Sequence, residues 1–348
     1  MQSNKPVILA LTDSKAGHET QTQGIVQLLN QQQAYQVEWI HLTIPNKWQY
    51  RLLKWFLPLL TSRSLSYFVD QHQLEKIRQY KVAYIVSAGG NTLLANALLK
   101  KELLKHGDVK NIVASSLRGI KATYFDVVFT IHAAQAALEH YLYYPIAPNK
   151  MCALPLTQLQ ARSNLGLNSS DQVIAVLIGA DTKTVGIGSA HAWGTTLHKI
   201  RSEYPDARLL VTTSRRTPIE FEQALTEYCE QKHLFKNTDQ ITWVAQGQQC
   251  DIKDYIVAAD WVLSSADSTS MVADVVMSGR PLVILCNESG MNDVQIQYQL
   301  HFLAQQRWLY LYQLSDAVNL QNIIPMLTPK NHSQALAKKM EQNLQRCL

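Results

Sequence analysis

The sequence predicts an α/β protein made of two successive Rossmann-like domains. The chain has 348 residues, and at about 100–200 residues per domain this length suits two domains. Hydrophobic residues make up 47% of it, enough to bury a core and to exclude a disordered or fibrous protein. Short apolar runs that end in Gly, Ser or Thr alternate with segments of helical period, which is typical of parallel sheets with crossover helices.

Ten apolar runs are predicted strands. Those in the first half are Val7–Leu11, Val37–Leu42, Val82–Ser87, Asn111–Ser115 and Val127–Ile131. Those in the second half are Val173–Ile178, Arg208–Thr213, Ile241–Val244, Trp261–Ser264 and Leu282–Leu285. A polar stretch from Gln158 to Gln172 separates the sets, so we expect domains of residues 1–158 and 159–348, facing each other across a cleft. Ligands of such sheets bind beyond the carboxyl ends of the strands, so the residues after each strand are the candidate site residues.

Charge and cysteine content narrow the function classes. The net charge is +5, from 32 Lys and Arg against 27 Asp and Glu, with no dense basic run, so nucleic acid is not an expected partner. Five cysteines without a Cys-x-x-Cys pair indicate reduced thiols and no zinc site. The first apolar run, Val7–Leu11, is too short for a signal peptide, and no stretch approaches a membrane span. We therefore expect a cytoplasmic protein.

The stretch from Trp39 to Val69 contains no acidic residue. Four apolar side chains in it share one face of a predicted helix and three cations share a neighbouring stripe: Trp48, Leu52, Trp55 and Leu59, and Lys47, Arg51 and Lys54. Such a helix suits the surface of an anionic membrane. Equally, it could pack on the core with its basic ends reaching solvent.

The segment Trp261–Leu285 is the strongest candidate for a ligand site. A strand is predicted to end at Ser264, and a helix to start near Ser268 and to stop at Gly279. Ser265, Asp267, Ser268 and Thr269 crowd the start of this helix, where free N–H groups and the helix dipole favour an anion. Capping alone needs only Asp267 or Ser268.

Two further loops follow strands of the second half. Thr217, Pro218 and Glu220 predict a capping box at a helix start. Ser214, Arg215 and Arg216 would then lie in the loop before that helix, where paired arginines suit a phosphate or carboxylate; a solvated loop is the alternative. Gly179 opens a loop with Gly186 and Gly188, but the pattern lacks the third glycine of a dinucleotide site, so NAD binding is not expected.

In the first half, Asp13, His18 and Glu19 follow the first strand. A His or carboxylate there can act as general base on a hydroxyl nucleophile, although a lone His is more often structural. Further strand ends give a candidate acceptor pocket: Gly89, Gly90, Asn91, Arg118 and His132. No Gly-x-Ser-x-Gly, Walker A or His-Glu-x-x-His pattern occurs, and no Asp-x-Asp pair is present to hold a metal on a diphosphate. We expect a metal-free site.

Taken together, these segments resemble the mitochondrial-fission ELM-like family of glycosyltransferase-like proteins. The resemblance runs in order from residue 13 to about 285 and rests on Asp13–Gln21, Val86–Gly89, Phe125–Val128, Val176–Gly179, Thr212–Pro218 and Ala266–Val272. The family is similar to the GT-B superfamily of two-domain nucleotide-sugar transferases and to the enzyme that adds N-acetylglucosamine to the lipid-linked peptidoglycan precursor. Its bacterial members are linked to lipooligosaccharide outer-core assembly.

The resemblance implies a metal-independent glycosyltransferase without a cofactor, because the nucleotide sugar is itself a substrate. The second domain would hold the donor through Gly179, the 214–216 loop and the 265–269 turn, with Asp274 on the ribose. His18 or Glu19, oriented by Asp13, would be the base, and the C-terminal helix could pack back on the first domain. This sequence has Asp274 where Glu is usual, Ala180 for a second Gly, and Cys250-Asp-Ile252 for Asn-Pro-Tyr.

The implied partners are a nucleotide sugar and an oligosaccharide or lipid-linked acceptor, with residues 47–68 holding the enzyme peripherally on the inner leaflet of the inner membrane. Two alternatives remain. A non-catalytic adaptor that recruits partners would bind no nucleotide. A nucleotide-sugar epimerase or hydrolase would turn over the donor without any acceptor.

Overall fold

The computed structural model describes residues 5–287, 290–313 and 318–346 and divides into two compact units. The first comprises residues 1–154 and 333–348, and the second comprises residues 155–332. Each unit holds one six-stranded sheet, and every strand pair in both sheets is parallel. The predicted α/β class with two Rossmann-like halves is confirmed.

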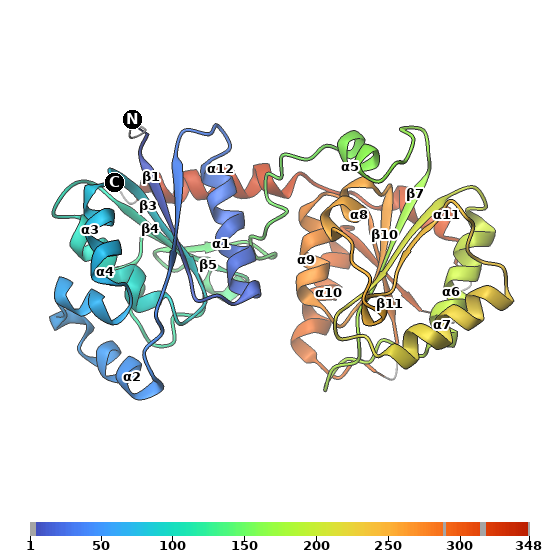
Figure 1. Cartoon of the computed structure of the whole chain (residues 1–348), viewed down its shortest axis with the longest axis horizontal. Helices are drawn as coiled ribbons and strands as arrows, with labels where there is room; N and C mark the ends of the chain where they lie inside the picture. Colours follow the sequence, from blue (N-terminus) through green and yellow to red (C-terminus); the bar gives the residue numbers. More distant parts are fainter. Residues whose placement is uncertain (1–4, 288–289, 314–317, 347–348) are drawn as a thin grey trace. The chain divides into compact units, whose positions relative to one another are not determined.

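The sheet of the first unit has the strand order β2-β1-β3-β4-β5-β6. Its strands are β1 (Val7–Thr12), β2 (Gln36–His41), β3 (Val82–Ala88), β4 (Lys110–Ala114), β5 (Val127–Thr130) and β6 (Tyr141–Tyr143). Its helices are α1 (Ala16–Leu29), α2 (Lys47–Trp55), α3 (Gln71–Gln79), α4 (Leu93–Leu103) and α12 (His332–Arg346). In Figure 1, α1 and α12 lie on one side of this sheet and α3 and α4 on the other. Leu9, Leu11 and Ile85 of the sheet pack in one buried cluster with Leu74 of α3 and Leu94 of α4.

The sheet of the second unit has the order β12-β11-β10-β7-β8-β9. Its strands are β7 (Val173–Ile178), β8 (Arg208–Thr213), β9 (Gln240–Thr242), β10 (Trp261–Ser265), β11 (Leu282–Cys286) and β12 (Leu309–Gln313). Its helices are α5 (Gln158–Asn164), α6 (Ala190–Glu203), α7 (Ile219–Gln231), α8 (Ile252–Ala258), α9 (Thr269–Met277), α10 (Val294–Gln305) and α11 (Leu320–Ile323). Chain order reverses between β7 and β10, which is the point of such sheets where ligands bind.

All ten predicted strands are present, and Val173–Ile178 and Arg208–Thr213 have the predicted bounds. Two strands were not predicted, β6 and β12. β6 has only three residues, Tyr141–Tyr143, which is too short a run to show the alternation of apolar and polar residues that predicts a strand. β12 alternates Leu and Tyr at the outer edge of its sheet.

The prediction of a capping box at the start of α7 is wrong. The helix begins at Ile219 with Pro218 at the N-cap position and no side-chain cap. The Thr217 hydroxyl instead donates to the Gly179 carbonyl at 2.7 Å and accepts from the Ser214 N–H at 2.9 Å. The Thr217 hydroxyl, which the local sequence predicts as the cap of α7, is therefore engaged by the Gly179 carbonyl of the neighbouring loop.

The helix start near Ser268 is confirmed. Ser268 is the N-cap of α9, and its hydroxyl accepts from the Met271 N–H at 3.3 Å. Beyond the helix, Gly279 has φ +72°, a left-handed conformation that suits glycine after a helix end.

The helix α2 begins after a capping box formed by Asn46 and Gln49. None of its residues is buried, and the predicted apolar face points away from the core: Trp48 is 73% exposed, Leu52 52%, Trp55 82% and, just beyond the helix, Leu59 76%. The opposite side packs inward through Tyr50 and Leu53. The core-packing interpretation of that face is therefore wrong.

None of the helices in the described part of the chain is both long enough and apolar enough to cross a bilayer.

Candidate functional site

Asp13 and His18 form a hydrogen-bonded pair in the first unit. Asp13 directly follows β1, and its carboxylate is fully buried. Its Oδ1 lies 2.8 Å from Nδ1 of His18, and its Oδ2 accepts from the Asn91 side-chain amide at 2.8 Å. Burial raises the pKa of Asp13, but hydrogen bonds from His18 and Asn91 outweigh it and hold the pKa below the ordinary value. The carboxylate is thus ionised at neutral pH.

An ionised carboxylate against Nδ1 fixes the tautomer of the neutral imidazole. Since Asp13 can only accept, Nδ1 carries the proton and Nε2 presents its lone pair. His18 sits in the first turn of α1, and its side chain is partly exposed. A base held in one orientation by a buried acid is the arrangement that takes a proton from a hydroxyl.

Gly89 makes room for the imidazole. It has φ +86°, and a Cβ on it would lie 2.1 Å from Nδ1 of His18. Any larger residue would push the ring away from Asp13. Of the residues predicted for the acceptor pocket, the structure thus brings Gly89 to His18 and Asn91 to Asp13.

Glu19 lies beside His18 in the sequence but is engaged elsewhere. Its Oε1 accepts from the Thr12 hydroxyl at 2.8 Å. The structure therefore gives the two candidate bases different partners: His18 is paired with an acid, and Glu19 with a hydroxyl donor.

Gly90 and Arg118 form a second group in the first unit. A Cβ on Gly90 would lie 2.3 Å from Nε of Arg118. Both loops are fastened to α2: the Tyr50 hydroxyl donates to the Gly90 carbonyl at 2.5 Å, and Lys54 Nζ donates to the Arg118 carbonyl at 2.7 Å. Sequence reasoning missed Tyr50 and Lys54 in this role because the contacts span 40 and 64 residues.

The remaining predicted acceptor residue, His132, lines a separate cavity of about 370 Å³ in the first unit. Gln21, Ser115, Thr130 and Tyr144 contribute to its wall. Burial raises the pKa of Tyr144 to about 12, so its phenol stays neutral. Gln21 lies one helical turn beyond His18 on α1.

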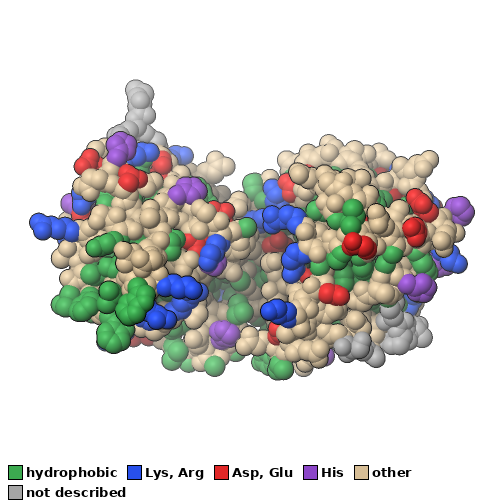
Figure 2. Space-filling view, turned by 60° about the horizontal axis from the view of Figure 1, so that its bottom comes forward, with side chains coloured by type: hydrophobic (Ala, Val, Ile, Leu, Met, Phe, Trp, Pro, Cys, Tyr) green, Lys and Arg blue, Asp and Glu red, His purple; other side chains and the backbone are tan. Residues whose placement is uncertain are grey.

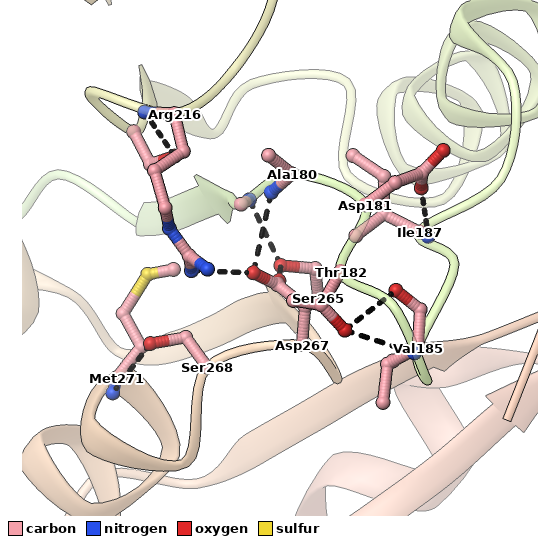
Figure 3. Close-up of polar contacts among 12 residues, drawn as sticks. Ala180, Asp181, Thr182, Val185, Ile187, Arg216, Ser265, Asp267, Ser268 and Met271 are labelled. Carbon is pink, nitrogen blue, oxygen red and sulfur yellow. Dashed lines mark hydrogen bonds and ion pairs between the residues drawn. The ribbon is translucent and has the colours of Figure 1, made fainter. Parts of the chain in front are cut away.

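The predicted donor-site residues of the second unit lie at the reversal point between β7 and β10 (Figure 3). Asp267 is its centre: its side chain is fully buried. Oδ1 accepts from the Ser265 hydroxyl at 2.5 Å, and Oδ2 accepts from the Ala180 N–H at 3.2 Å and from Nη2 of Arg216 at 2.8 Å. The carboxylate is therefore engaged by its own chain, and it holds Arg216 in place.

Gly179 permits this packing. A Cβ on it would lie 1.9 Å from Oδ1 of Asp267. The Gly179 N–H donates to the Ser265 hydroxyl at 2.9 Å. The loop that follows closes on itself, because Asp181 accepts from the Ile187 N–H at 2.7 Å (Figure 3).

A hollow of about 680 Å³ lies against this group and is lined by Ser214–Arg216 and Asp267–Ser270. The side chain of Arg216 is 56% exposed despite its ion pair. Two arginines thus border the same hollow as the first turn of α9, where N–H groups are free of helical partners. Guanidinium groups and helix N-termini both bind phosphate.

Three predicted donor residues do not line this hollow. Gly179 lies behind Asp267. Ser265 is completely buried and is consumed by its bonds to Gly179 and Asp267. Asp274 is buried in the second turn of α9.

Sequence reasoning also missed Glu222 of α7. It is completely buried, and its Oε1 accepts from the Thr213 hydroxyl and from the Ala245 N–H at 2.9 Å. It joins the end of β8 to the turn after β9. A charged residue among the first positions of a helix is usually exposed to solvent, so the sequence around Glu222 does not indicate that its side chain is buried.

Among the described residues, no group of three or more His, Cys, Asp or Glu could hold a metal ion. Cys152, Cys229, Cys250 and Cys286 are in the reduced thiol form. Burial raises the pKa of Cys229 to about 12. Cys347 lies outside the described residues.

A family model described as Mitochondrial fission ELM1 matches residues 16–341. Among solved structures, the chain is similar to UDP-GlcNAc 2-epimerase from Methanocaldococcus jannaschii, with 12% identity, a TM-score of 0.49, and coverage of 97% of this chain and 92% of that one. It is also similar to Phytolacca americana UGT2 complexed with UDP-2-fluoro-glucose and pterostilbene, with 11% identity, a TM-score of 0.47, and coverage of 98% and 94%. A third similar structure is E. coli ADP-heptose LPS heptosyltransferase II, with 14% identity, a TM-score of 0.43, and coverage of 98% of this chain and 99% of that one. No curated protein matches the sequence.

Proposed function

Because the chain belongs to the mitochondrial fission ELM1 family, we propose that it is a GT-B glycosyltransferase. It moves a sugar from a nucleotide-sugar donor to a hydroxyl of a saccharide acceptor, with the acceptor on the first unit and the donor on the second. The acceptor is the lipid-linked core of a lipooligosaccharide, met on the cytoplasmic side of the inner membrane.

The observation that carries this proposal is the Asp13–His18 pair. Nε2 of His18 takes the proton of the acceptor hydroxyl as the oxygen bonds to the anomeric carbon of the sugar. The bond from that carbon to the phosphate oxygen breaks, and its electron pair leaves with the nucleoside diphosphate. Asp13 stabilises the imidazolium that forms, 2.8 Å away.

The hollow beside α9 suits the departing diphosphate. Arg215 and Arg216 supply positive charge, and the first N–H groups of α9 supply fixed donors, so that charge develops against groups already in place. Ser268 and Thr269 border the phosphates, and Asp267 and Gly179 fix the wall behind them. In this scheme the arginines neutralise the leaving group and no metal ion is required.

Nucleotide binding tests the proposal. CMP, UDP, GDP and ADP and their sugars would be screened by thermal shift, with one nucleotide expected to raise the melting temperature by several degrees at about 100 times its Kd. Arg215→Gln should weaken that nucleotide about tenfold, since it removes a charge-assisted contact. The matched control is Arg307→Gln, an exposed arginine after α10, outside the hollow.

The outcomes separate the competing functions. If no nucleotide shifts the melting temperature, the glycosyltransferase is excluded and a non-catalytic adaptor is favoured. If the bound nucleotide sugar is consumed without any acceptor, the protein is an epimerase or hydrolase.

A further inference from the structure

The outer face of α2 and the turn after it, residues 47–59, form an exposed apolar surface that we call the α2 face. It consists of Trp48, Leu52, Trp55, Phe56 and Leu59, each more than half exposed. Side chains of this size are usually kept from water, and gathered in one patch they mark an interaction site. Figure 2 shows hydrophobic side chains collected at the lower left of the view, with Lys and Arg side chains next to them.

Charge restricts what this face can meet. Lys47 and Arg51 are exposed beside the apolar side chains, and no Asp or Glu occurs from Trp39 to Val69. The face therefore combines tryptophans with positive charge that no acidic residue of the same segment offsets. Tryptophan favours the boundary between water and acyl chains, and clustered Lys and Arg are attracted to anionic headgroups.

From this combination we infer that the α2 face docks on an anionic lipid surface, with Trp48, Trp55 and Leu59 entering the headgroup region and Lys47 and Arg51 against the headgroups. An amphipathic helix with one apolar face and a basic border lies in the plane of such a surface rather than across it. The short length of α2, nine residues, fits this orientation.

The inner side of α2 links this surface to the candidate acceptor residues. Tyr50 holds the Gly90 carbonyl, and Lys54 holds the Arg118 carbonyl. Burial raises the pKa of Tyr50 to about 12, which keeps its hydroxyl a donor. A bilayer under the α2 face would thus lie on the opposite side of α2 from the loops that carry Gly90 and Arg118. This step rests on the proposed function, because it supplies the surface on which a lipid-linked acceptor is met.

Vesicle co-sedimentation of the full chain tests the inference without any nucleotide. We expect binding to vesicles of phosphatidylglycerol and phosphatidylcholine, little binding to phosphatidylcholine alone, and weaker binding as salt is raised. Lys47→Gln with Arg51→Gln should weaken binding about 25-fold, at about fivefold per cation. Trp48→Gln with Trp55→Gln should weaken it at least about tenfold through lost apolar burial.

The matched control is Val294→Gln with Tyr298→Gln on α10 of the second unit, where the side chains are 76% and 71% exposed. This variant should bind vesicles as the unchanged protein does. All variants should keep their melting temperature, because every substituted side chain is exposed.

Equal loss in the control and in the α2 variants would overturn the inference, and so would full vesicle binding by the α2 variants. If the Trp48 and Trp55 variant converts a lipid-free dimer into monomers, the face is an interface between copies and not a lipid surface. Vesicle binding without any nucleotide binding would leave the inference standing and remove the proposed function.

Discussion

Among single residues, Asp13 shows most directly how position in the fold determines chemistry. Its place after the first strand made it a candidate from sequence, together with His18. The sequence places Asn91, the third residue of this group, in the acceptor pocket. It does not reveal the hydrogen bond from the Asn91 amide to Asp13, because that bond joins residues 78 positions apart. Sequence indicates which residues leave the carboxyl ends of strands, but not which of them meet.

Substitution of the two candidate bases, His18 and Glu19, should affect kcat differently. His18→Gln should lower kcat by about 10²–10⁴, the usual contribution of a general base. Glu19→Gln should leave kcat nearly unchanged, because that carboxylate accepts from Thr12 and has no acid to orient it. Transfer assays and nucleotide thermal shifts on both variants check this, with donor binding expected to persist in each. Loss of transfer in Glu19→Gln alone would assign the base to Glu19.

Gly179 offers a test of the wall behind the donor hollow. In Gly179→Ala the new methyl would lie 1.9 Å from Oδ1 of Asp267, so Asp267 must move and release Arg216. We expect a loss of about 1–3 kcal/mol in unfolding free energy and weaker nucleotide binding.

Gly186→Ala in the same loop is the matched control for Gly179→Ala. Its added methyl meets nothing closer than 3.6 Å. Chemical denaturation of the two variants compares them directly. Equal stability would mean that the Asp267 network is not rigid.

At the scale of elements, local pattern predicted most strands but failed where a tertiary contact competes. Thr217 has the sequence of a cap, yet the Gly179 carbonyl takes its hydroxyl. The apolar period of α2 correctly predicted a helix. It did not decide whether the apolar face of that helix meets a membrane surface or the protein core. Only the packing of Tyr50 and Leu53 on the core decides that the tryptophan side points outward.

The start of α12 should make stability depend on pH. Burial, with a smaller contribution from Lys330, lowers the pKa of His332 to about 4. The unfolded chain takes up a proton near pH 6.5 and the folded chain does not, so stability is full above pH 6.5 and falls as the pH drops toward 4. The loss is about 3 kcal/mol.

His332→Gln should flatten this dependence, as urea titrations between pH 7 and 4 would show. His191→Gln on the surface of α6 serves as control and should keep the original slope. An unchanged slope in His332→Gln would assign the acid sensitivity to other groups.

On the scale of the whole molecule, the chain does not finish where its second unit finishes. Residues 333–348 belong to the first unit, although 178 residues of the second unit, 155–332, stand between them and the rest of it. The Ser333 hydroxyl accepts from the Ala153 N–H at 2.8 Å, and Lys339 lies over the ring of Tyr144. Composition and length predict two domains, but they cannot show that one domain is closed by a helix from the far end.

The stability of the first unit should therefore depend on α12. Leu336 is completely buried and Met340 nearly so, and Leu336→Ala should cost about 2–5 kcal/mol. Hydrogen exchange would show faster opening of β1 and β3 with little change in β7 and β10, since each unit has its own core. Leu300→Ala, a buried leucine of α10, should produce the reverse pattern. If Leu336→Ala loosens β7 and β10 instead, α12 contributes its buried face to the second unit, and the first must be stable without it.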